Sequence, residues 1–526
     1  MENASKDTAA ARGRAEHRGE MAISAPRTRA VGSLKGSALL AQSRAELAED
    51  YGTLISLIDR RARALRQLRS EVWASAIPHR VRAETESRVS SLLEADEASL
   101  AGLHRLKQKA HVAGSLAGLT QALRREAEVM RARQAVASGL FVAADWHSPS
   151  VDHSVHPNRG PRQGSARLHH DEYKRDRHPD QAVWENEWLR EMVDNPSSHP
   201  LRALMTASGM AAFTTILAHV DDQVGPGPVL MGAGTYHECR DLLTRSAFGR
   251  RIISLPEADP VAWLEALDHH PAAVFLDTMC NAAGLAVPEV GEWIEFLHAR
   301  GRPVILVLDN TTLSATFQPW RHLPAGTPVR VISFESLTKY AQLGMDRAAG
   351  GVVVASTQEA DAMDALREHL GTNIADVVVY QHPWPDRRLL EHRLARIGRN
   401  AALIAERAAL EIAENDGPFQ VVYPSLLPAS RRDPGFHGGV LAIETTEPDA
   451  IFLYRRLIDS ILRVAAARGV PICHGTSFGL DTTRVYLTAG NSQSGTPFMR
   501  VSAGSEHVLG TQAVADVVAE SLSLVR

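Results

Sequence analysis

The sequence is poor in cysteine, in long apolar runs and in net charge, and each shortage excludes a class of protein. Three cysteines among 526 residues are too few, and odd in number, for a disulfide framework, and no CxxC pair suggests structural zinc. No apolar run approaches the ~18 residues of a membrane span. A formal net charge of −4 gives no basic surface for nucleic acid. We therefore predict a cytoplasmic protein, in a reducing compartment, that binds neither membrane nor nucleic acid.

Residues 1–36 also lack the apolar core of a secretory signal. They are rich in Arg, Ala and Ser, as transit peptides are, but four acidic residues argue against that assignment: Glu2, Asp7, Glu16 and Glu20. We predict that this segment is a disordered tail.

Apolar residues recur at three- and four-residue steps from Leu39 to about Met130, in three runs with short breaks between them. This spacing predicts three amphipathic helices, and the short connections favour an antiparallel bundle. The first run is interrupted once, at Arg61, and Pro78 follows its end. We predict an all-α helical bundle over residues 37–135.

Residues 136–170 lose this periodicity and are rich in Ser, Pro, Gly and His, which is typical of a long connection. No cysteine lies among the histidines, and their spacing does not fit a zinc site: His147, His153, His156, His169 and His170. We predict a linker here and no metal site.

Strand and helix patterns alternate after residue 170, which predicts an α/β fold built on a large parallel sheet. We expect Leu201–His219 to form a helix led by a T-A-S-G-M turn. The predicted large domain covers 171–395, and a small α+β domain covers 396–526. Ligands bind such sheets at the carboxyl ends of the strands, where the sequence places a set of polar residues: Tyr236, Asp277, Asn281, Asp309 and Lys339.

Lys339 is unusual because lysine is normally solvated, yet it follows an apolar run, V-I-S-F, through a short polar turn. Asp309 ends another apolar run, V-I-L-V-L-D. An amine and a carboxylate at two strand ends suit pyridoxal 5'-phosphate. The lysine forms the Schiff base, and the aspartate keeps the pyridine nitrogen protonated so that the ring accepts electrons. The sequence thus predicts a pyridoxal-phosphate enzyme.

Residues ~170–526 resemble the fold type I pyridoxal-phosphate enzymes of cysteine and methionine metabolism, which include cystathionine γ-synthase and methionine γ-lyase. The motifs that carry the resemblance are S-G-M at 208–210, D-T-M-C-N at 277–281, D-N-T at 309–311 and S-L-T-K-Y at 336–340. In that family the first and last motifs hold the phosphate, and a tyrosine stacks on the ring. The resemblance implies these cofactor-binding residues: Ser208, Gly209, Met210, Tyr236, Asn281, Asp309, Thr311, Ser336, Thr338 and Lys339.

Further matches to that family concern the substrate and a partner subunit. Arg500, in M-R-V-S-A-G, matches the arginine that binds the substrate carboxylate, a task that suits a planar bidentate fork. Ser477 matches a serine beside that carboxylate. Tyr173 and Arg175 match a segment that reaches the phosphate of the neighbouring subunit. The resemblance therefore implies a homodimer or homotetramer with shared active sites.

Two departures from the family pattern predict a remodelled pocket. His237 and Glu238 stand where the family has two glycines. Gln342, Leu343 and Met345 replace glycines and a histidine after the lysine. Glu238 in particular suggests a non-standard, cationic amino acid as substrate, such as a sulfonium compound.

The predicted reaction is α-proton abstraction by Lys339, followed by β/γ-elimination or γ-replacement with Tyr236 as the acid for the leaving group. One alternative is a sensor that binds the cofactor without turnover. Another is a bifunctional or regulated protein. Its helical part weakly resembles the all-helical chorismate mutases in Leu57-Ile58-Asp59, Arg69, Arg80 and Leu119-Thr120-Gln121, although a partner-binding bundle is the simpler interpretation.

Overall fold

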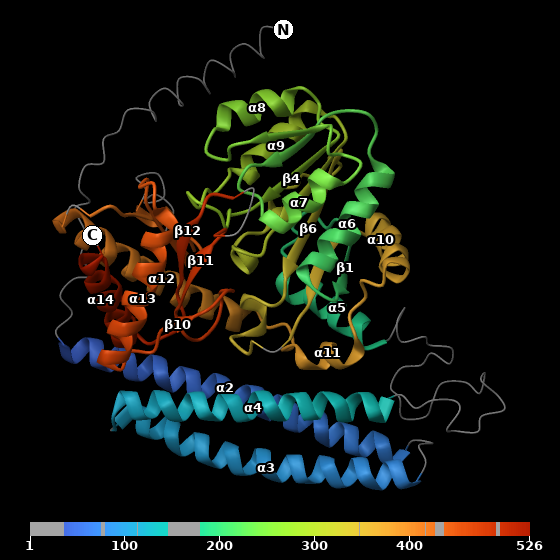
Figure 1. The fold of residues 1–526 in the computed structure, drawn as a ribbon. Helices are drawn as coiled ribbons and strands as arrows, with labels where there is room; N and C mark the ends of the chain where they lie inside the picture. Colours follow the sequence, from blue (N-terminus) through green and yellow to red (C-terminus); the bar gives the residue numbers. More distant parts are fainter. Residues whose placement is uncertain are drawn as a thin grey trace.

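The computed structural model describes a helical bundle, a large α/β part and a C-terminal lobe (Figure 1). The described residues are 36–74, 79–112, 114–145, 179–346, 348–415, 417–426, 436–490 and 495–525. The predicted tail, most of the predicted linker, and Tyr173 and Arg175 lie outside these residues.

The bundle consists of three long helices that lie side by side beneath the rest of the molecule in Figure 1, as the apolar spacing predicts. They are α2 (Gly36–Ala74), α3 (His79–Val112) and α4 (Leu116–Asp145). Helix α4 continues past the predicted end at residue 135, because Ala137, Leu140 and Phe141 extend its buried apolar face.

Arg61, which interrupts the apolar pattern of the first helix, is buried at the centre of the bundle. Its Nε and Nη2 donate to the two carboxylate oxygens of Asp96 at 2.9 and 2.6 Å. Its Nη1 donates to the carbonyl of Met130 at 2.7 Å. One guanidinium therefore joins α2, α3 and α4, and its charge is compensated by a carboxylate that is equally buried.

The bundle is attached to the C-terminal lobe by arginines of α12 (Arg387–Asn415). The buried guanidinium of Arg396 donates to Glu49 Oε2 at 2.7 Å and also pairs with Asp50. Arg399 pairs with Glu46. All three acidic residues lie on α2, so this helix is held along one side by ionic contacts.

The large sheet has the strand order β1-β7-β6-β5-β4-β2-β3. Its strands are β1 (Leu201–Thr206), β2 (Val229–Gly232), β3 (Ile252–Leu255), β4 (Ala273–Asp277), β5 (Val304–Asp309), β6 (Val329–Ser336) and β7 (Gly351–Ser356). Only β7 is antiparallel to its neighbours. A parallel pair needs a crossover helix, whereas the described part of 337–350 contains only a short 3-10 turn. The sheet predicted as parallel is therefore mixed.

The expectation of a helix over Leu201–His219 is wrong for its first six residues. Leu201–Thr206 pairs residue by residue with β7, and the helix that follows starts at Gly209. L-R-A-L-M-T is apolar enough for either structure, and pairing with β7 selects the strand.

Helices cover both faces of the large sheet, which explains its nearly continuous apolar strands. Helices α6, α7 and α10 pack on one face, and α5, α8, α9 and α12 pack on the other. Their bounds are α5 (Pro179–Met192), α6 (Gly209–Gln223), α7 (His237–Arg245), α8 (Pro260–Asp268), α9 (Val290–Arg300) and α10 (Thr357–Leu370), with α11 (Asp376–Gln381) next to α4.

The C-terminal lobe has the predicted α+β character, with a five-stranded sheet in the order β10-β11-β12-β9-β8. Its elements are β8 (Gln420–Val422), β9 (Val440–Glu444), α13 (Ala450–Arg468), β10 (Cys473–His474), β11 (Arg484–Thr488), β12 (Phe498–Ser502) and α14 (Val508–Leu524). The predicted boundary at residue 395 falls inside α12, so this one helix belongs to both cores.

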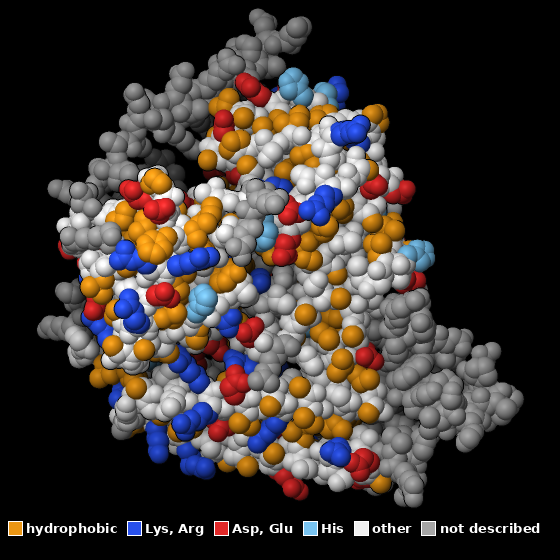
Figure 2. All heavy atoms as spheres, viewed as in Figure 1, with side chains coloured by type: hydrophobic (Ala, Val, Ile, Leu, Met, Phe, Trp, Pro, Cys, Tyr) orange, Lys and Arg blue, Asp and Glu red, His pale blue; other side chains and the backbone are white. Residues whose placement is uncertain are grey.

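Acidic and basic side chains are mixed over the face of the molecule seen in Figure 2. None of the described helices is both long and apolar enough to cross a membrane. All three cysteines are free thiols; Cys239 and Cys280 are buried and Cys473 is exposed.

We predict that Arg61→Met destabilises the bundle by about 3–5 kcal/mol, because Asp96 would remain buried with only the long 3.4 Å contact to Arg133. Denaturant unfolding followed by far-ultraviolet circular dichroism measures this change. Arg63→Met is the matched control: Arg63 lies on the same helix in an exposed pair with Asp59, and its loss should change the free energy of unfolding by about 0.5 kcal/mol or less. Equal effects of the two substitutions would contradict a structural role for the buried pair.

Candidate active site

Polar side chains converge on a cavity of about 1200 Å³ at the carboxyl end of the large sheet, where the C-terminal lobe covers it. Every predicted site residue that the structure describes lines this cavity: Ser208, Gly209, Met210, Tyr236, Glu238, Asn281, Asp309, Thr311, Ser336, Thr338, Lys339, Ser477 and Arg500. Their individual roles remain predictions. Among the described residues, no group of three or more His, Cys, Asp or Glu side chains is arranged to hold a metal ion.

Lys339 lies just after β6, and its amine points towards the C-terminal lobe. Its Nζ donates to the hydroxyl of Ser477 at 2.9 Å and lies 5.4 Å from the ring centre of Phe478. Burial, together with the nearby Arg500 charge, lowers the pKa of Lys339 to about 8. A useful fraction of the amine is therefore neutral, and so nucleophilic, near physiological pH.

Asp309 and Asp277 are register partners at the ends of the parallel strands β5 and β4. Burial, the charge of Asp309 and that of Glu257 raise the pKa of Asp277 well above its usual range. Burial also raises the pKa of Asp309, although its Oδ1 accepts from the backbone N–H of Thr311 at 2.9 Å. Two adjacent buried carboxyls favour a cationic or proton-bearing group on the side that faces the cavity. A pyridinium N–H is such a group.

The turn between β1 and α6 forms a cradle for an anion. Ser208 caps α6, and its Oγ accepts from the backbone N–H of Ala211 at 3.0 Å. A Cβ atom at Gly209 would lie 2.7 Å from the Cβ of Ser336, so only glycine fits this approach. Ser336 and Thr338 share a hydrogen bond of 2.7 Å between their hydroxyls. A helix start faced by two hydroxyls fits a phosphate group.

Tyr236 precedes α7, and its hydroxyl lies near the carboxylate of Glu238. Burial and the charge of Glu238 raise the pKa of Tyr236 well above its usual range. The phenol therefore keeps its proton at neutral pH and can donate it. The ring of His237 lies edge-on to that of Tyr236, with 4.9 Å between the ring centres.

Arg500 reaches the cavity from β12 and is almost completely buried, which lowers its pKa to about 10. Nη1 donates to Asn281 Oδ1 and Nη2 to the carbonyl of Ser477, both at a long 3.3 Å, and Nε has no partner among the described residues. These weak contacts leave the fork able to bind a carboxylate. The backbone of Ser477 adopts the left-handed region, with φ of 74°. In this conformation its hydroxyl accepts a hydrogen bond from Lys339, and its carbonyl accepts one from Arg500.

Asp277 and Phe478 also line the cavity, and the sequence motifs give neither of them a role. The sequence places Asp277 at a strand end without a role, because only strand register shows that it lies beside Asp309. The ring of Phe478 lies beneath both cations, at 5.4 Å from the Lys339 amine and 5.9 Å from the Arg500 guanidinium. Its position next to Ser477 was the available signal.

The two predicted departures have different outcomes. His237 and Glu238 line the cavity, so that part of the expected remodelling lies in the pocket. Gln342, Leu343 and Met345 are not among its lining residues. These three replacements in the family's glycine-rich turn therefore do not change the lining of this cavity.

Residues 119–433 match the sequence model of the family described as Cys/Met metabolism PLP-dependent enzymes. The chain belongs to this family. The match begins inside α4 and ends before β9, whereas the resemblance seen in the motifs extends from ~170 to 526. Membership confirms a pyridoxal-phosphate-dependent enzyme, and the cavity fits the cofactor: an amine of lowered pKa, an acid pair for the ring nitrogen and a cradle for the phosphate.

Similar proteins agree with this assignment. The bifunctional enzyme flvA of Aspergillus flavus is 28% identical over 343 residues, which are 63% of this chain and 40% of flvA. The chain thus spans less than half the length of that relative. A cystathionine gamma synthase from Xanthomonas oryzae pv. oryzae has a TM-score of 0.53 at 19% identity, and CalE6, a methionine gamma lyase from Micromonospora echinospora, has 0.51 at 23%. Each alignment covers 68% of this chain and 89% of the other, and confirms fold type I.

We predict that Gly209→Ala weakens the affinity for pyridoxal 5'-phosphate by about tenfold or more, because the methyl group displaces Ser336 from the cradle and removes hydrogen bonds to a charged phosphate. Titration of the apoenzyme, followed by its visible absorbance, measures the Kd. Gly225→Ala is the control, since no atom lies within 4 Å of its added Cβ. An unchanged Kd in the Gly209 variant would remove the phosphate from this turn.

The pKa of Lys339 predicts the pH dependence of cofactor capture. A protonated amine does not attack an aldehyde, so the rate at which apoenzyme and pyridoxal 5'-phosphate form the yellow species should rise with pH, with its midpoint at about pH 8. Stopped-flow absorbance across this range measures it, and Lys339→Ala should form no such species. A rate that keeps rising beyond pH 10, as for an ordinary lysine, would contradict the effect of burial.

Proposed function

We propose that this enzyme removes the α-proton of an amino acid and then eliminates or replaces a group on its β- or γ-carbon, as carbon–sulfur lyases and synthases do. One observation carries the proposal. Ser477 accepts a hydrogen bond from the Lys339 amine and another, through its carbonyl, from Arg500. A carboxylate bound at Arg500 would therefore bring its α-carbon close to the base.

The residues of the cavity divide the work of this reaction. Arg500 binds and orients the substrate carboxylate, and Asn281 limits the movement of the guanidinium. Lys339, neutral in part of the population, accepts the α-proton at Nζ. Pyridoxal phosphate, when bound, supplies the electron sink for the resulting carbanion. Asp309 and Asp277 together retain a proton beside the ring nitrogen.

Tyr236 suits the second half of the reaction. Its raised pKa keeps the phenol protonated, so it can transfer the hydroxyl proton to a departing sulfur or oxygen.

Glu238 supports a cationic substrate. It lines the cavity in the first turn of α7, where it contacts the hydroxyl that would face the leaving group. A carboxylate at this position attracts positive charge on the γ-substituent, such as a sulfonium, and repels a carboxylate there. The substrate class we propose is therefore an amino acid with a cationic leaving group at Cγ.

A homodimer or homotetramer in the cytoplasm completes the proposal. The motif for a shared active site, Tyr173 and Arg175, falls outside the described residues, so the resemblance alone supports it. The three unpaired cysteines suit a reducing compartment.

The alternatives receive less support. Thr120 and Gln121 of the mutase-like pattern line a second cavity, but Arg69 is exposed and is not one of its lining residues. The side chain of Arg80 is outside the described set. A sensor without turnover would not require the contacts that Ser477 makes to both Lys339 and Arg500.

Glu238→Gln tests the substrate class. We expect kcat/KM for a sulfonium amino acid, S-methylmethionine, to fall about tenfold or more, while that for its neutral counterpart, methionine, changes little. Glu292→Gln is the control, because Glu292 is exposed on α9 and lies outside the cavity. Equal effects on both substrates would reject the cationic preference. Absence of α-proton exchange with solvent for either substrate would reject the reaction itself.

A further inference from the structure

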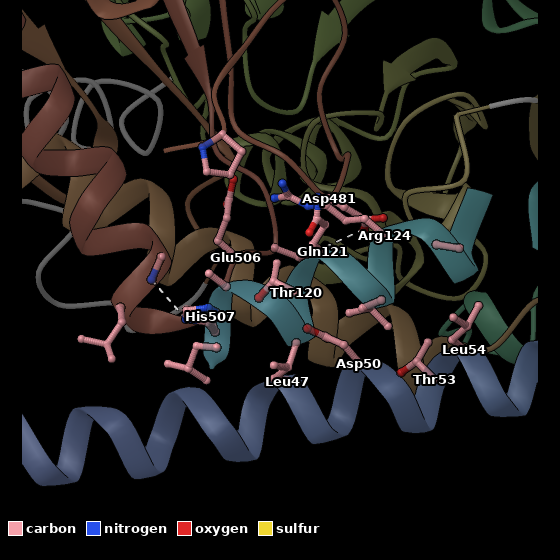
Figure 3. A pocket seen from close by; sticks show the side chains of 18 of the residues that line it. Leu47, Asp50, Thr53, Leu54, Thr120, Gln121, Arg124, Asp481, Glu506 and His507 are labelled. Atoms are coloured by element: carbon pink, nitrogen blue, oxygen red, sulfur yellow. Dashed lines mark hydrogen bonds between the residues drawn. The ribbon is translucent and has the colours of Figure 1, made fainter. Parts of the chain in front are cut away.

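A second cavity, of about 680 Å³, lies between the bundle and the C-terminal lobe (Figure 3). Helix α2 contributes Leu47, Asp50 and Leu54, and α4 contributes Thr120 and Arg124. The opposite wall comes from the C-terminal lobe. No residue lines both this cavity and that of Lys339, so the two are separate sites.

The second cavity has an apolar floor. The side chains that form it come from α2, α4 and α14 and include Leu47, Leu54, Leu57, Leu116, Leu123 and Val514. This floor suits a branched or thioether side chain rather than a polar one.

The polar end of this cavity holds a cation, Arg124, and a carboxylate, Glu506, one oxygen of which has no partner among the described residues. Arg124 has no hydrogen-bond or ion-pair partner among the described residues, although it is near enough to Glu506 to oppose the rise that burial causes in the pKa of that carboxyl. Glu506 is only 9% exposed. Its Oε1 accepts from the backbone N–H of Thr483 at 2.5 Å, whereas Oε2 has no partner. Such a buried acceptor is costly unless something donates to it.

The other charges of this cavity compensate one another. Asp481 accepts from Arg131 at 3.0 Å and from Arg393 at 2.8 Å. Asp50 pairs with Arg396. A ligand is therefore offered one free cation, one free carboxylate oxygen and an apolar surface.

We propose that the second cavity binds a free α-amino acid with an apolar side chain. The ligand carboxylate pairs with Arg124, its ammonium donates to Oε2 of Glu506, and its side chain packs on the leucines. The hydroxyl of Thr120, whose Oγ1 is buried without a partner, supplies a further polar contact. A simple fatty acid would leave Glu506 unsatisfied, and a simple amine would leave Arg124 unsatisfied.

This site is coupled to the Lys339 cavity by the segment that follows the lysine. Leu343 and Met345 line the second cavity, and Met345 belongs to the apolar cluster of the bundle. Arg131 of α4 donates to the carbonyl of Gly344 at 2.7 Å. The bound amino acid therefore touches a segment that begins at the catalytic lysine.

A second route reaches the same lysine through one ion pair and two hydrogen bonds. Asp346 pairs with Arg484 at 2.8 Å, and Arg484 donates to the carbonyl of Thr476 at 2.9 Å. Thr476 precedes Ser477, which holds the Lys339 amine. The amino acid is thus an effector, and its binding changes turnover by shifting the position of Lys339 or Ser477.

Calorimetry with L-leucine, L-methionine and L-phenylalanine tests the site. The holoenzyme carries Arg500→Ala, so that the active site no longer anchors carboxylates. We expect one molecule of the best ligand per chain, with binding weakened about tenfold or more by Arg124→Gln and unchanged by Arg125→Gln, its exposed neighbour outside the cavity. Glu506→Gln should weaken binding of the amino acid but not of 4-methylpentanoate, which lacks the ammonium group.

The outcomes separate the parts of the proposal. Absence of binding by all three amino acids, or equal binding in the Arg124 and Arg125 variants, would overturn the site. Equal affinity for L-leucine, 4-methylpentanoate and 3-methylbutylamine would overturn the zwitterion assignment. With Arg500 intact, the bound amino acid should change kcat/KM in the wild type and not in Arg124→Gln. Binding without that change would overturn the coupling, and none of the binding results depends on the reaction proposed above.

Discussion

The active site depends on burying like charges in pairs around one cavity. Asp277 and Asp309 share one side, where the charge of Asp309 makes Asp277 harder to ionise. Lys339 and Arg500 share the other side, where the charge of Arg500 makes Lys339 easier to deprotonate. The cavity is therefore predisposed towards a ligand that brings a protonated ring nitrogen to the carboxyls and a carboxylate to the guanidinium, which a cofactor and an amino acid do together.

Much of this site could be predicted from the sequence, because residues at the ends of parallel strands meet at one edge of a sheet whatever the details of packing. Asp309 and Lys339 were found on that ground. Local sequence patterns do not determine strand register or strand pairing. The sequence analysis misses two features for this reason. Asp277 joins Asp309 only because β4 and β5 align residue by residue, and Leu201–Thr206 is a strand only because β7 lies beside it. Arg500 and Ser477 came from family motifs alone.

The segment after Lys339 departs from the family pattern, but the departure does not change the active-site cavity. Gln342, Leu343 and Met345 depart from the family pattern, and a changed pocket was the natural interpretation. The side chain of Met345 packs in the apolar cluster of α2, α3 and α4. Gln342 is buried, and its amide donates to the carbonyl of Thr338 at 2.5 Å. Leu343 and Met345 therefore contact the second cavity and the bundle, whereas Glu238 is a change that lines the active-site cavity.

The arginines of α12 have a consequence for the history of this protein. Arg396 and Arg399 have their acidic partners on α2, and α12 itself runs through the cores of both the large part and the C-terminal lobe. Loss of the bundle in one step would remove these counterions and expose the face of α12 that α2 covers, including the buried guanidinium of Arg396. Sequence change in α2 and α12 should therefore be concerted across relatives, and a bundle-free descendant would need several compensating substitutions along α12 before the loss became tolerable.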